Sequence, residues 1–337
     1  MGLLTERATR HHQEIARALW FEAPGQCVLR EEPLEGAGSG SVRVRALYSG
    51  ISRGTESTVF KGLVPESERE RMRGPHMGGQ FPFPVKYGYA MVGVVEEGPE
   101  NLSGKTVFAL HPHQDRFTVE ASAVTPLPAH LPPERAVLTA NMETALNIVW
   151  DAMIQPGDRV AVFGAGVVGT LVAFLSAGIA GTQTLLIDRD LERASLASAL
   201  GLDFALSDHV SGEFDVLINA SGASAALSQA IELAGMEARI VEASWYGERP
   251  TTVPLGGAFH SRRLSIVSSQ VGSIPPHRRA RWTYSRRLTK AMDLLQDDRL
   301  DALISGETAF DDLQVAYPRI LDATATLCHR VRYQPRG

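Results

Sequence analysis

The sequence predicts an α/β protein with two domains, one small and strand-rich and one built on a parallel, doubly wound sheet. Up to about residue 130 the chain consists of short β-branched runs that are closed by Gly or Pro. From about residue 140 short apolar strands alternate with helical stretches, which is typical of a parallel sheet covered on both faces. The length of 337 residues is sufficient for two domains, each with its own core.

The first domain is predicted to span residues 1–138. "ALWFEAPGQCVLREEPL" predicts two strands joined by a turn at Pro24 and Gly25. "SVRVRALYSGIS" alternates apolar and polar residues, as a half-buried strand does, and "VKYGYAMVGVVEEG" and "KTVFALHPH" predict further strands. Pro133 then opens a helix, because proline fits the first helical turn.

The second domain is predicted at residues 139–271, followed by a return of the chain, 272–337, that packs on the first domain. A helix in "METALNIVWDAMI" has Glu143 and Thr144 at its start, and "RVAVF", "TLLI", "DVLINA" and "ARIVEAS" predict strands. In the return, "RRARWTYSRRLTKAMDLLQDDRL" predicts one amphipathic helix, and a last helix starts at Asp311.

Composition is that of a globular protein, with 44% hydrophobic and 21% charged residues. The net charge of −5 gives no broad basic field, so we expect no nucleic-acid partner. Seven arginines between Arg262 and Arg287 form a local cluster, which is either a solvated helix face or an anion-binding rim for a carboxylated substrate.

The two cysteines, Cys27 and Cys328, belong to no C-x-x-C pair, so reduced thiols in a cytoplasmic protein are expected. The first 20 residues contain no apolar segment of the kind found in a secretory signal, and they predict a polar helical extension.

An uncharged run of 21 residues, from Ala161 to Gly181, has the length of a membrane span. It contains the motif G-x-G-x-x-G, which follows a predicted strand and opens a predicted helix. Asp188 ends the next strand, 19 residues past Gly169. This context is that of a dinucleotide-binding site, so we expect no membrane span.

Each part of the motif has a physical reason. Gly164 permits the tight turn, Gly166 lets the backbone approach a pyrophosphate, and Gly169 lets the helix pack close to the strand. Free N–H groups at the helix start, with Val167 and Val168, face the phosphates.

The acidic residue after the second strand favours NAD. Asp188 accepts hydrogen bonds from the adenosine ribose and repels a 2′-phosphate, whereas the adjacent Arg189 keeps NADP as an alternative. Arg193 either covers the same ribose or is a surface residue of the following helix.

Three segments, "QPGDRVAVFGAGVVGTLVAFL", "IDRDLERASLASALG" and "VLINASG", resemble those of the medium-chain dehydrogenase/reductase superfamily. The resemblance runs from about Ala18 onward and implies a GroES-like, β-rich catalytic domain in two sequence pieces around a Rossmann domain. It also implies a cleft site between the domains, cofactor contacts at Ala220, Ser221 and Thr144, and a homodimer. For Thr144 the alternative is a helix N-cap.

The zinc ligands of that superfamily's alcohol dehydrogenases are replaced in this sequence. "SGISRGTES" puts Ser52 at the position of a cysteine ligand, "KYGYAMVG" puts Tyr89 at that of a histidine, and "LTANMETAL" puts Ala140 near the third. Such side chains do not make a closed zinc site, so we expect no bound metal. "SGISRGTES" and "YGYAMVG" most resemble the branch that contains bacteriochlorophyllide hydroxyethyl dehydrogenases.

Without zinc, a hydrogen-bond donor or an acid–base group must handle the substrate oxygen. Tyr89 is the first candidate, with a packing role as the alternative. Ser52 and Thr55 line the same pocket or hold the turn, and Glu56 is a base or a capping residue.

"HPHQD" supplies another cluster. In a strand, His111, His113 and Asp115 would share one face, as an acid–base or metal site. Pro112 favours a loop, in which these residues have structural or surface roles. His113 is the acid–base candidate taken from this cluster.

The sequence and the resemblance together predict a zinc-independent, NAD(H)-dependent oxidoreductase of a secondary alcohol and its ketone, a small-molecule substrate whose reacting side chain lies on a planar ring. The alternatives are an NADPH-dependent quinone or enone reductase and a nucleotide-binding protein without turnover.

Overall fold

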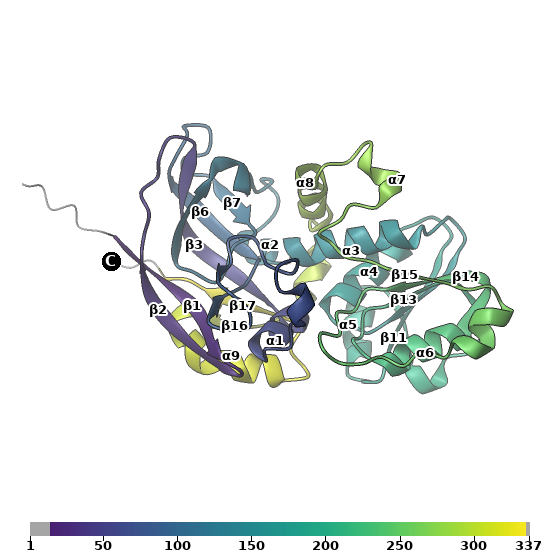
Figure 1. Cartoon of the computed structure of the whole chain (residues 1–337). Helices are drawn as coiled ribbons and strands as arrows, with labels where there is room; N and C mark the ends of the chain where they lie inside the picture. The colour runs from purple at the N-terminus through teal and green to yellow at the C-terminus, as the bar shows by residue number, and fades with distance from the viewer. Residues whose placement is uncertain (1–13, 335–337) are drawn as a thin grey trace, which may run out of the picture.

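The computed structural model describes residues 14–334. Of the helical extension predicted for the first 20 residues, residues 1–13 lie outside the described part of the chain, and residues 15–20 belong to a strand instead. Antiparallel strands form one body, and a parallel sheet with flanking helices forms the other (Figure 1). The predicted fold class, an α/β protein with a separate β-rich domain, is confirmed.

The β-rich domain contains two sheets. One has the strand order β2-β1-β5-β4, and the other has the order β16-β17-β3-β6-β7-β9 with β8 paired to β3. The strands of the first part of the chain are β1 (Ile15–Ala23), β2 (Gln26–Pro33), β3 (Ser41–Ser52), β4 (Gly78–Gly79), β5 (Val85–Lys86), β6 (Met91–Glu97), β7 (Thr106–Ala109), β8 (Arg116–Glu120) and β9 (Val124–Pro126). The helices are α1 (Arg53–Phe60) and α2 (Pro133–Ala136), and Pro133 lies in the first turn of α2 as predicted.

The end of the chain, from β16 onward, completes this domain. Strand β17 (Cys328–Arg332) pairs antiparallel with β3, opposing Cys328 to Ser52, and β16 (Ile304–Ala309) pairs parallel with β17. Helix α9 (Leu313–Asp322) packs on β2 and α1, below the antiparallel strands in Figure 1. Cys328, close to the end of the chain, therefore lies beside Ser52 and the start of α1.

The parallel sheet has the order β12-β11-β10-β13-β14-β15, so the direction of winding reverses between β10 and β13. Its strands are β10 (Arg159–Phe163), β11 (Gln183–Asp188), β12 (Asp203–Leu206), β13 (Phe214–Asn219), β14 (Ala234–Glu242) and β15 (Ser265–Ser268). Successive residues of β10 enter different cores: Val160 and Val162 pack with α3 and α4, whereas Ala161 and Phe163 pack with α6. This alternation is why the strands are apolar throughout.

The helices of this part of the chain cover both faces of the sheet (Figure 1). They are α3 (Thr139–Ala152), α4 (Val167–Ala177), α5 (Arg193–Ala199) and α6 (Ser224–Leu233). Two further helices are α7 (Pro276–Arg279) and α8 (Tyr284–Leu294), and α8 packs on α3. Within residues 14–334, no helix is both long enough and apolar enough to cross a bilayer.

Three local predictions are wrong. The single helix predicted after residue 277 is two, α7 and α8, because the Thr283 side chain caps a new helix by accepting a hydrogen bond from the Arg286 N–H. The last helix begins at Leu313 rather than Asp311, after a short 3₁₀ turn. Helix α3 begins at Thr139, so Thr144 lies inside it and donates to the Ala140 carbonyl rather than capping its start.

Candidate functional site

The glycine turn between β10 and α4 has the geometry of a phosphate cradle. Gly164 has a φ of +100°, and a Cβ there would lie 2.7 Å from the Cα of Ser221. A Cβ on Gly169 would lie 1.9 Å from the Gly164 carbonyl oxygen, so only glycine allows α4 to start this close to the strand. In contrast, a Cβ on Gly166, the N-cap of α4, would meet nothing within 4 Å.

The open space at Gly166 is what a nucleotide diphosphate requires. The N–H groups of the first turn of α4, which begins at Val167 and Val168, have no carbonyl partner within the helix. They present a positive dipole end to a bound anion. The residues present therefore fit a dinucleotide.

Asp188 ends β11 beside this turn and is partly exposed. Its Oδ2 accepts the Ala165 N–H at 2.7 Å, and its Oδ1 accepts the Asp190 N–H at 3.0 Å. Each carboxylate oxygen retains a second lone pair, so Asp188 supports the turn and can still accept a ribose hydroxyl.

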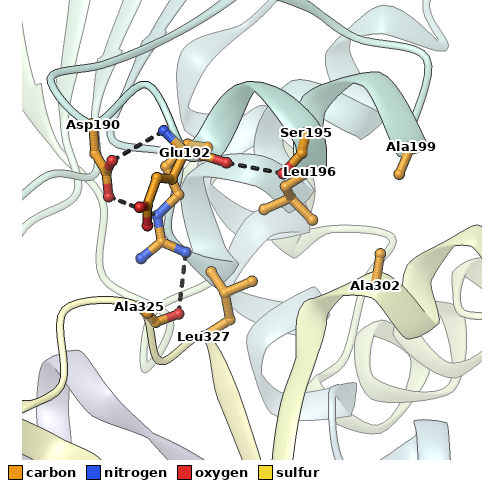
Figure 2. A pocket seen from close by; sticks show the side chains of 9 residues that line it. Asp190, Glu192, Ser195, Leu196, Ala199, Ala302, Ala325 and Leu327 are labelled. Atoms are coloured by element: carbon orange, nitrogen blue, oxygen red, sulfur yellow. Dashed lines mark hydrogen bonds and ion pairs between the residues drawn. The ribbon is translucent and has the colours of Figure 1, made fainter.

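Arg193, at the start of α5, contacts the returning end of the chain. Its guanidinium donates to the carbonyls of Thr324 and Ala325, at 2.5 and 3.4 Å, next to a hollow of about 400 Å³ (Figure 2). The Arg193 side chain is only 11% exposed, so it is not a solvated surface residue. Arg189 is exposed.

The carboxyl ends of β13 and β14 carry a polar network on the other side of the glycine turn. Asn219 Nδ2 donates to Glu242 Oε2 at 2.8 Å and to the Tyr246 hydroxyl at 3.0 Å. The Tyr246 hydroxyl donates to Glu242 Oε2 at 3.0 Å, and the Ser244 N–H donates to Glu242 Oε1 at 2.8 Å. Burial, followed by the nearby charge of Glu242, raises the pKa of Tyr246 to about 12.

Ala220 and Ser221 lie between this network and the glycine turn. The Ala220 N–H donates to the Phe163 carbonyl at 2.9 Å, and the Ser221 hydroxyl donates to Asn219 Oδ1 at 2.6 Å. Both residues therefore follow the end of β13, directly beside Gly164.

The facing wall comes from the β-rich domain at the junction of β3 and α1. Tyr89 packs against both main hydrophobic cores, and hence lies where the two domains meet. Its hydroxyl is within reach of the Ser52 and Thr55 side chains, while Asn141 of α3 donates to Ser52 Oγ at 3.2 Å. Burial, followed by the charge of Glu56, raises the pKa of Tyr89 to about 12. The phenol is therefore a neutral hydrogen-bond donor at neutral pH.

A loop of the parallel-sheet domain closes on this wall. Trp245, in the loop after β14, packs against the core of the β-rich domain, and the Glu248 N–H donates to the Leu63 carbonyl at 3.2 Å. A Cβ on Gly247 would lie 2.5 Å from that carbonyl oxygen. The loop therefore joins the Glu242 network to the domain that carries Tyr89.

Glu56 and His113 are brought together, but in the interior. Both side chains are 0% exposed, and Glu56 Oε2 lies 2.9 Å from His113 Nε2. Glu56 also accepts the Ser52 N–H at 2.7 Å and the hydroxyl of Tyr317 from α9. On its other side, His113 Nδ1 is 2.7 Å from Ser49 Oγ, which is 2.9 Å from the Tyr333 hydroxyl.

This buried network fixes the turn that presents Ser52 and Thr55. Burial raises the pKa of Tyr317 well above its usual value, and the adjacent Glu56 charge adds to that shift. The Glu56 carboxylate accepts hydrogen bonds from three protein groups, so its oxygens are satisfied without water. Its position behind the α1 start makes it a positioning group rather than one that touches a substrate.

His111, His113 and Asp115 lie in a loop, as Pro112 indicated, and not on one face of a strand. The His111 ring stacks on Phe117 with centroids 3.8 Å apart. Asp115 instead accepts the Arg17 N–H at 2.7 Å. Burial lowers the pKa of His111 well below its usual value.

The arginine cluster is divided between solvent and the interior. Arg263, Arg279, Arg281 and Arg286 are exposed, as the interpretation of a solvated face requires, whereas Arg287 is buried. Arg287 is 2% exposed; it lies 3.0 Å from Glu143 and 2.5 Å from Asn147, which ties α8 to α3. Arg262 donates to the Ala234 carbonyl at 2.6 Å. Glu143 thus has a structural partner that the sequence did not reveal.

Ser52, Tyr89 and Ala140, which the resemblance aligns with zinc ligands, carry no thiolate, imidazole or carboxylate. Ser52 and Tyr89 offer hydroxyls, and Ala140 offers no ligand atom. Within residues 14–334 no group of three or more His, Cys, Asp or Glu side chains is arranged to hold a metal ion. Cys27 and Cys328 are free, buried thiols, in agreement with the prediction of reduced cysteines.

The sequence reasoning missed several residues of these walls. Arg53 follows Ser52 directly, and its guanidinium donates to the Ala323 carbonyl at 3.2 Å. Burial, followed by the charge of Arg193, lowers the pKa of Arg53, and the charge of Asp188 opposes that shift. Glu242 and Tyr246 lie in "VEASWYG", where a carboxylate at the end of a parallel strand was the available signal. Tyr317 and Tyr333 had no local signal.

No family model matches the chain. The starvation-sensing protein RspB of Escherichia coli is 23% identical over 76% of this chain and 84% of its own length. An uncharacterised zinc-type alcohol dehydrogenase-like protein of Haemophilus influenzae is 23% identical over 86% of this chain and 90% of its own length.

Solved structures share the fold over nearly the whole chain. The rspB alcohol dehydrogenase of E. coli, in complex with NADH, matches with a TM-score of 0.75 at 18% identity over 95% of this chain and 99% of its own. The 2R,3R-butanediol dehydrogenase of Bacillus subtilis matches with a TM-score of 0.76 at 18% identity over 95% and 100%. The chain thus shares the fold of these alcohol dehydrogenases, and its distant sequence similarity to RspB and to the zinc-type alcohol dehydrogenase-like protein extends along most of its length.

Proposed function

We propose that the protein is an NAD(H)-dependent, zinc-independent oxidoreductase that interconverts a secondary alcohol and its ketone. The observation that carries the proposal is the pairing of two walls. One is a glycine turn that opens on free space at Gly166. The other, where the domains meet, gathers the hydroxyls of Tyr89, Ser52 and Thr55.

The nucleotide would be held by Gly164, Gly166 and Gly169, with the N–H groups at the start of α4 on the diphosphate. A bound nicotinamide supplies or accepts the hydride. Ala220 and Ser221 border the same space. Arg53 and Arg193 would lie along the phosphates and the adenosine ribose. Thr144 is a further proposed contact of the nucleotide, which rests only on the resemblance to the superfamily.

Asp188 supports NAD over NADP, because a carboxylate accepts ribose hydroxyls and repels a 2′-phosphate. Arg189 is adjacent and exposed, so NADP is the alternative. The relative affinities of the purified protein for the two nucleotides distinguish them.

Tyr89 would donate its hydroxyl hydrogen to the substrate oxygen and so stabilise the charge that develops there. Its pKa of about 12 keeps the proton on the phenol at neutral pH. Ser52 and Thr55 would orient that hydroxyl, and Asn141 would hold Ser52. Glu56 and His113 would keep the α1 start in place.

Zinc independence rests on the donor set, since hydroxyls are poor ligands for this metal. The test is metal content: purified protein is expected to hold far less than one zinc per chain and to keep its activity after dialysis against a chelator. Stoichiometric zinc whose removal abolishes activity would contradict this part of the proposal.

The substrate class is proposed from the resemblance to the bacteriochlorophyllide branch, as a carbinol on the side chain of a planar ring. An enone or quinone reductase would leave the carbinol unchanged and reduce an alkene, so product analysis separates the two. A nucleotide-binding protein without turnover would bind NADH and reduce no carbonyl.

Substitution of Tyr89 tests the chemical role. Tyr89→Phe is expected to lower kcat about 100- to 1,000-fold with little change in KM, because it removes one donor that acts mainly in the transition state. Tyr284→Phe is the matched control, since Tyr284 is exposed on α8. Equal activity of the two variants would remove Tyr89 from the mechanism.

A further inference from the structure

Glu242 is the last residue of β14 and lies next to Asn219, the last residue of β13, in register across the parallel pair. In a doubly wound sheet, a dinucleotide spans the strand ends on both sides of the switch point. Here the switch point is between β10 and β13. Asp188, which would bind the adenosine ribose, ends a strand on one side of this switch point. The nicotinamide half of the nucleotide is therefore expected over the ends of β13 and β14, on the other side.

The contacts of Glu242 are those of an ionised carboxylate. Its two oxygens accept from the Ser244 N–H, the Asn219 amide and the Tyr246 hydroxyl, all between 2.8 and 3.0 Å. Each of these three groups donates a hydrogen to it, so the carboxylate needs no proton of its own. The donors also fix its orientation, because they come from the end of β13 and from the loop after β14.

The charge of the Glu242 carboxylate is not balanced by an ion pair: among the ion pairs formed by residues 14–334, none involves Glu242. All three of its hydrogen-bond partners are neutral. A half-buried carboxylate with neutral partners retains an unbalanced negative charge.

We propose that Glu242 is a redox-state selector, whose carboxylate favours the oxidised, positively charged nicotinamide ring over the neutral reduced ring. Asn219 and Tyr246 act as positioning residues that hold the carboxylate at the strand ends. The inference rests on the proposed nicotinamide site and adds to it the residue that sets the relative affinity for its two forms.

The direction of the effect follows from Coulomb attraction. The oxidised ring carries one positive charge that the reduced ring lacks, so a nearby carboxylate stabilises only the former. Solvent screening at a half-buried site keeps the gain modest, on the order of tenfold in affinity. Because the carboxylate stabilises the oxidised ring more than the reduced ring, it makes hydride transfer from the bound reduced nucleotide to a ketone more favourable.

The experiment measures binding rather than turnover. The whole protein and its Glu242→Gln variant are titrated with NAD⁺ by calorimetry and with NADH by fluorescence. We expect Glu242→Gln to weaken NAD⁺ binding about tenfold and NADH binding less than twofold. Glu242→Asp, which keeps the charge, is expected to retain most of the wild-type affinity ratio. Glu248→Gln is the matched control, because Glu248 is exposed on the same loop.

An equal loss for both nucleotides in Glu242→Gln, or no change in either, would overturn the inference while leaving the nicotinamide site intact. Failure of the wild-type protein to bind either nucleotide would instead overturn the proposed function. If Glu242→Gln does not fold, wild-type affinities for NAD⁺, NADH and ADP-ribose decide. Tighter binding of NAD⁺ than of NADH relative to ADP-ribose supports the inference, and the reverse order refutes it.

Discussion

Removal of the Glu56 carboxylate should destabilise the β-rich domain more than any surface change of the same kind. In Glu56→Ala, the Ser52 N–H, His113 Nε2 and the Tyr317 hydroxyl all lose their acceptor, and the side chains of His113 and Tyr317 are fully buried. An unsatisfied buried polar group costs about 1–3 kcal/mol, and three donors lose their acceptor here. Because the contributions overlap and water can enter the space, we expect a total loss of about 3–5 kcal/mol.

The assay is urea unfolding followed by circular dichroism, with hydrogen exchange of the β3 and α1 amides to localise the loss. Glu100→Ala is the matched control, because Glu100 is exposed in a turn. We expect the amides of β3 and α1 to lose protection in Glu56→Ala while those of β10 and α4 change little. A loss below about 1 kcal/mol, or one equal to that of the control, would refute the reasoning.

Two further predictions concern pH and the glycine turn. Burial raises the pKa of Cys328 from 9.0 to about 12 and that of Tyr89 from 10.0 to about 12, so the folded state holds these protons more tightly than the unfolded state. Their stabilisation is full below about pH 9 and is lost as the pH rises toward 12, so the urea midpoint should fall across that window; a constant midpoint would contradict this. In the glycine turn, Gly169→Ala should prevent folding, since its Cβ would lie 1.9 Å from a carbonyl oxygen, whereas Gly166→Ala should fold normally and lose nucleotide binding. Equal stability of the two variants in thermal unfolding would show that the turn is not held as the structure has it.

The fold could be predicted because its signals are local. Strand and helix alternation, the position of the G-x-G-x-x-G and an acidic residue at the next strand end all lie within about 30 residues of one another. The glycine roles follow from the same short stretch, because backbone geometry fixes which positions exclude a Cβ. The only sign in the sequence that the chain returns to the first domain was the end of the strand–helix alternation after β15.

The rest of the site depends on contacts that no local pattern encodes. Tyr317 reaches Glu56 across 261 positions of sequence, and Arg287 reaches Glu143 across 144. An amphipathic pattern shows that α8 has a polar side, but it cannot show that one arginine on it is buried against a carboxylate of α3. The partners of Asp115 and His111 could not be predicted for the same reason, because a loop gives each side chain its own direction.

The chemistry that the proposed site can support depends on the side chains that would contact the substrate oxygen. A divalent cation would polarise a substrate oxygen strongly, whereas Tyr89 offers one neutral hydrogen bond, and the nearest carboxylate, Glu56, already has three donors. A neutral hydroxyl stabilises the charge that develops on the substrate oxygen less than a metal ion does. The structure of the substrate therefore has to supply more of the stabilisation. A carbinol next to an aromatic ring does so, because conjugation stabilises its ketone. We therefore expect ring-conjugated secondary alcohols to be oxidised much faster than aliphatic ones of the same size, and a panel of matched pairs that shows no such preference would remove the physical reason for a substrate on a planar ring.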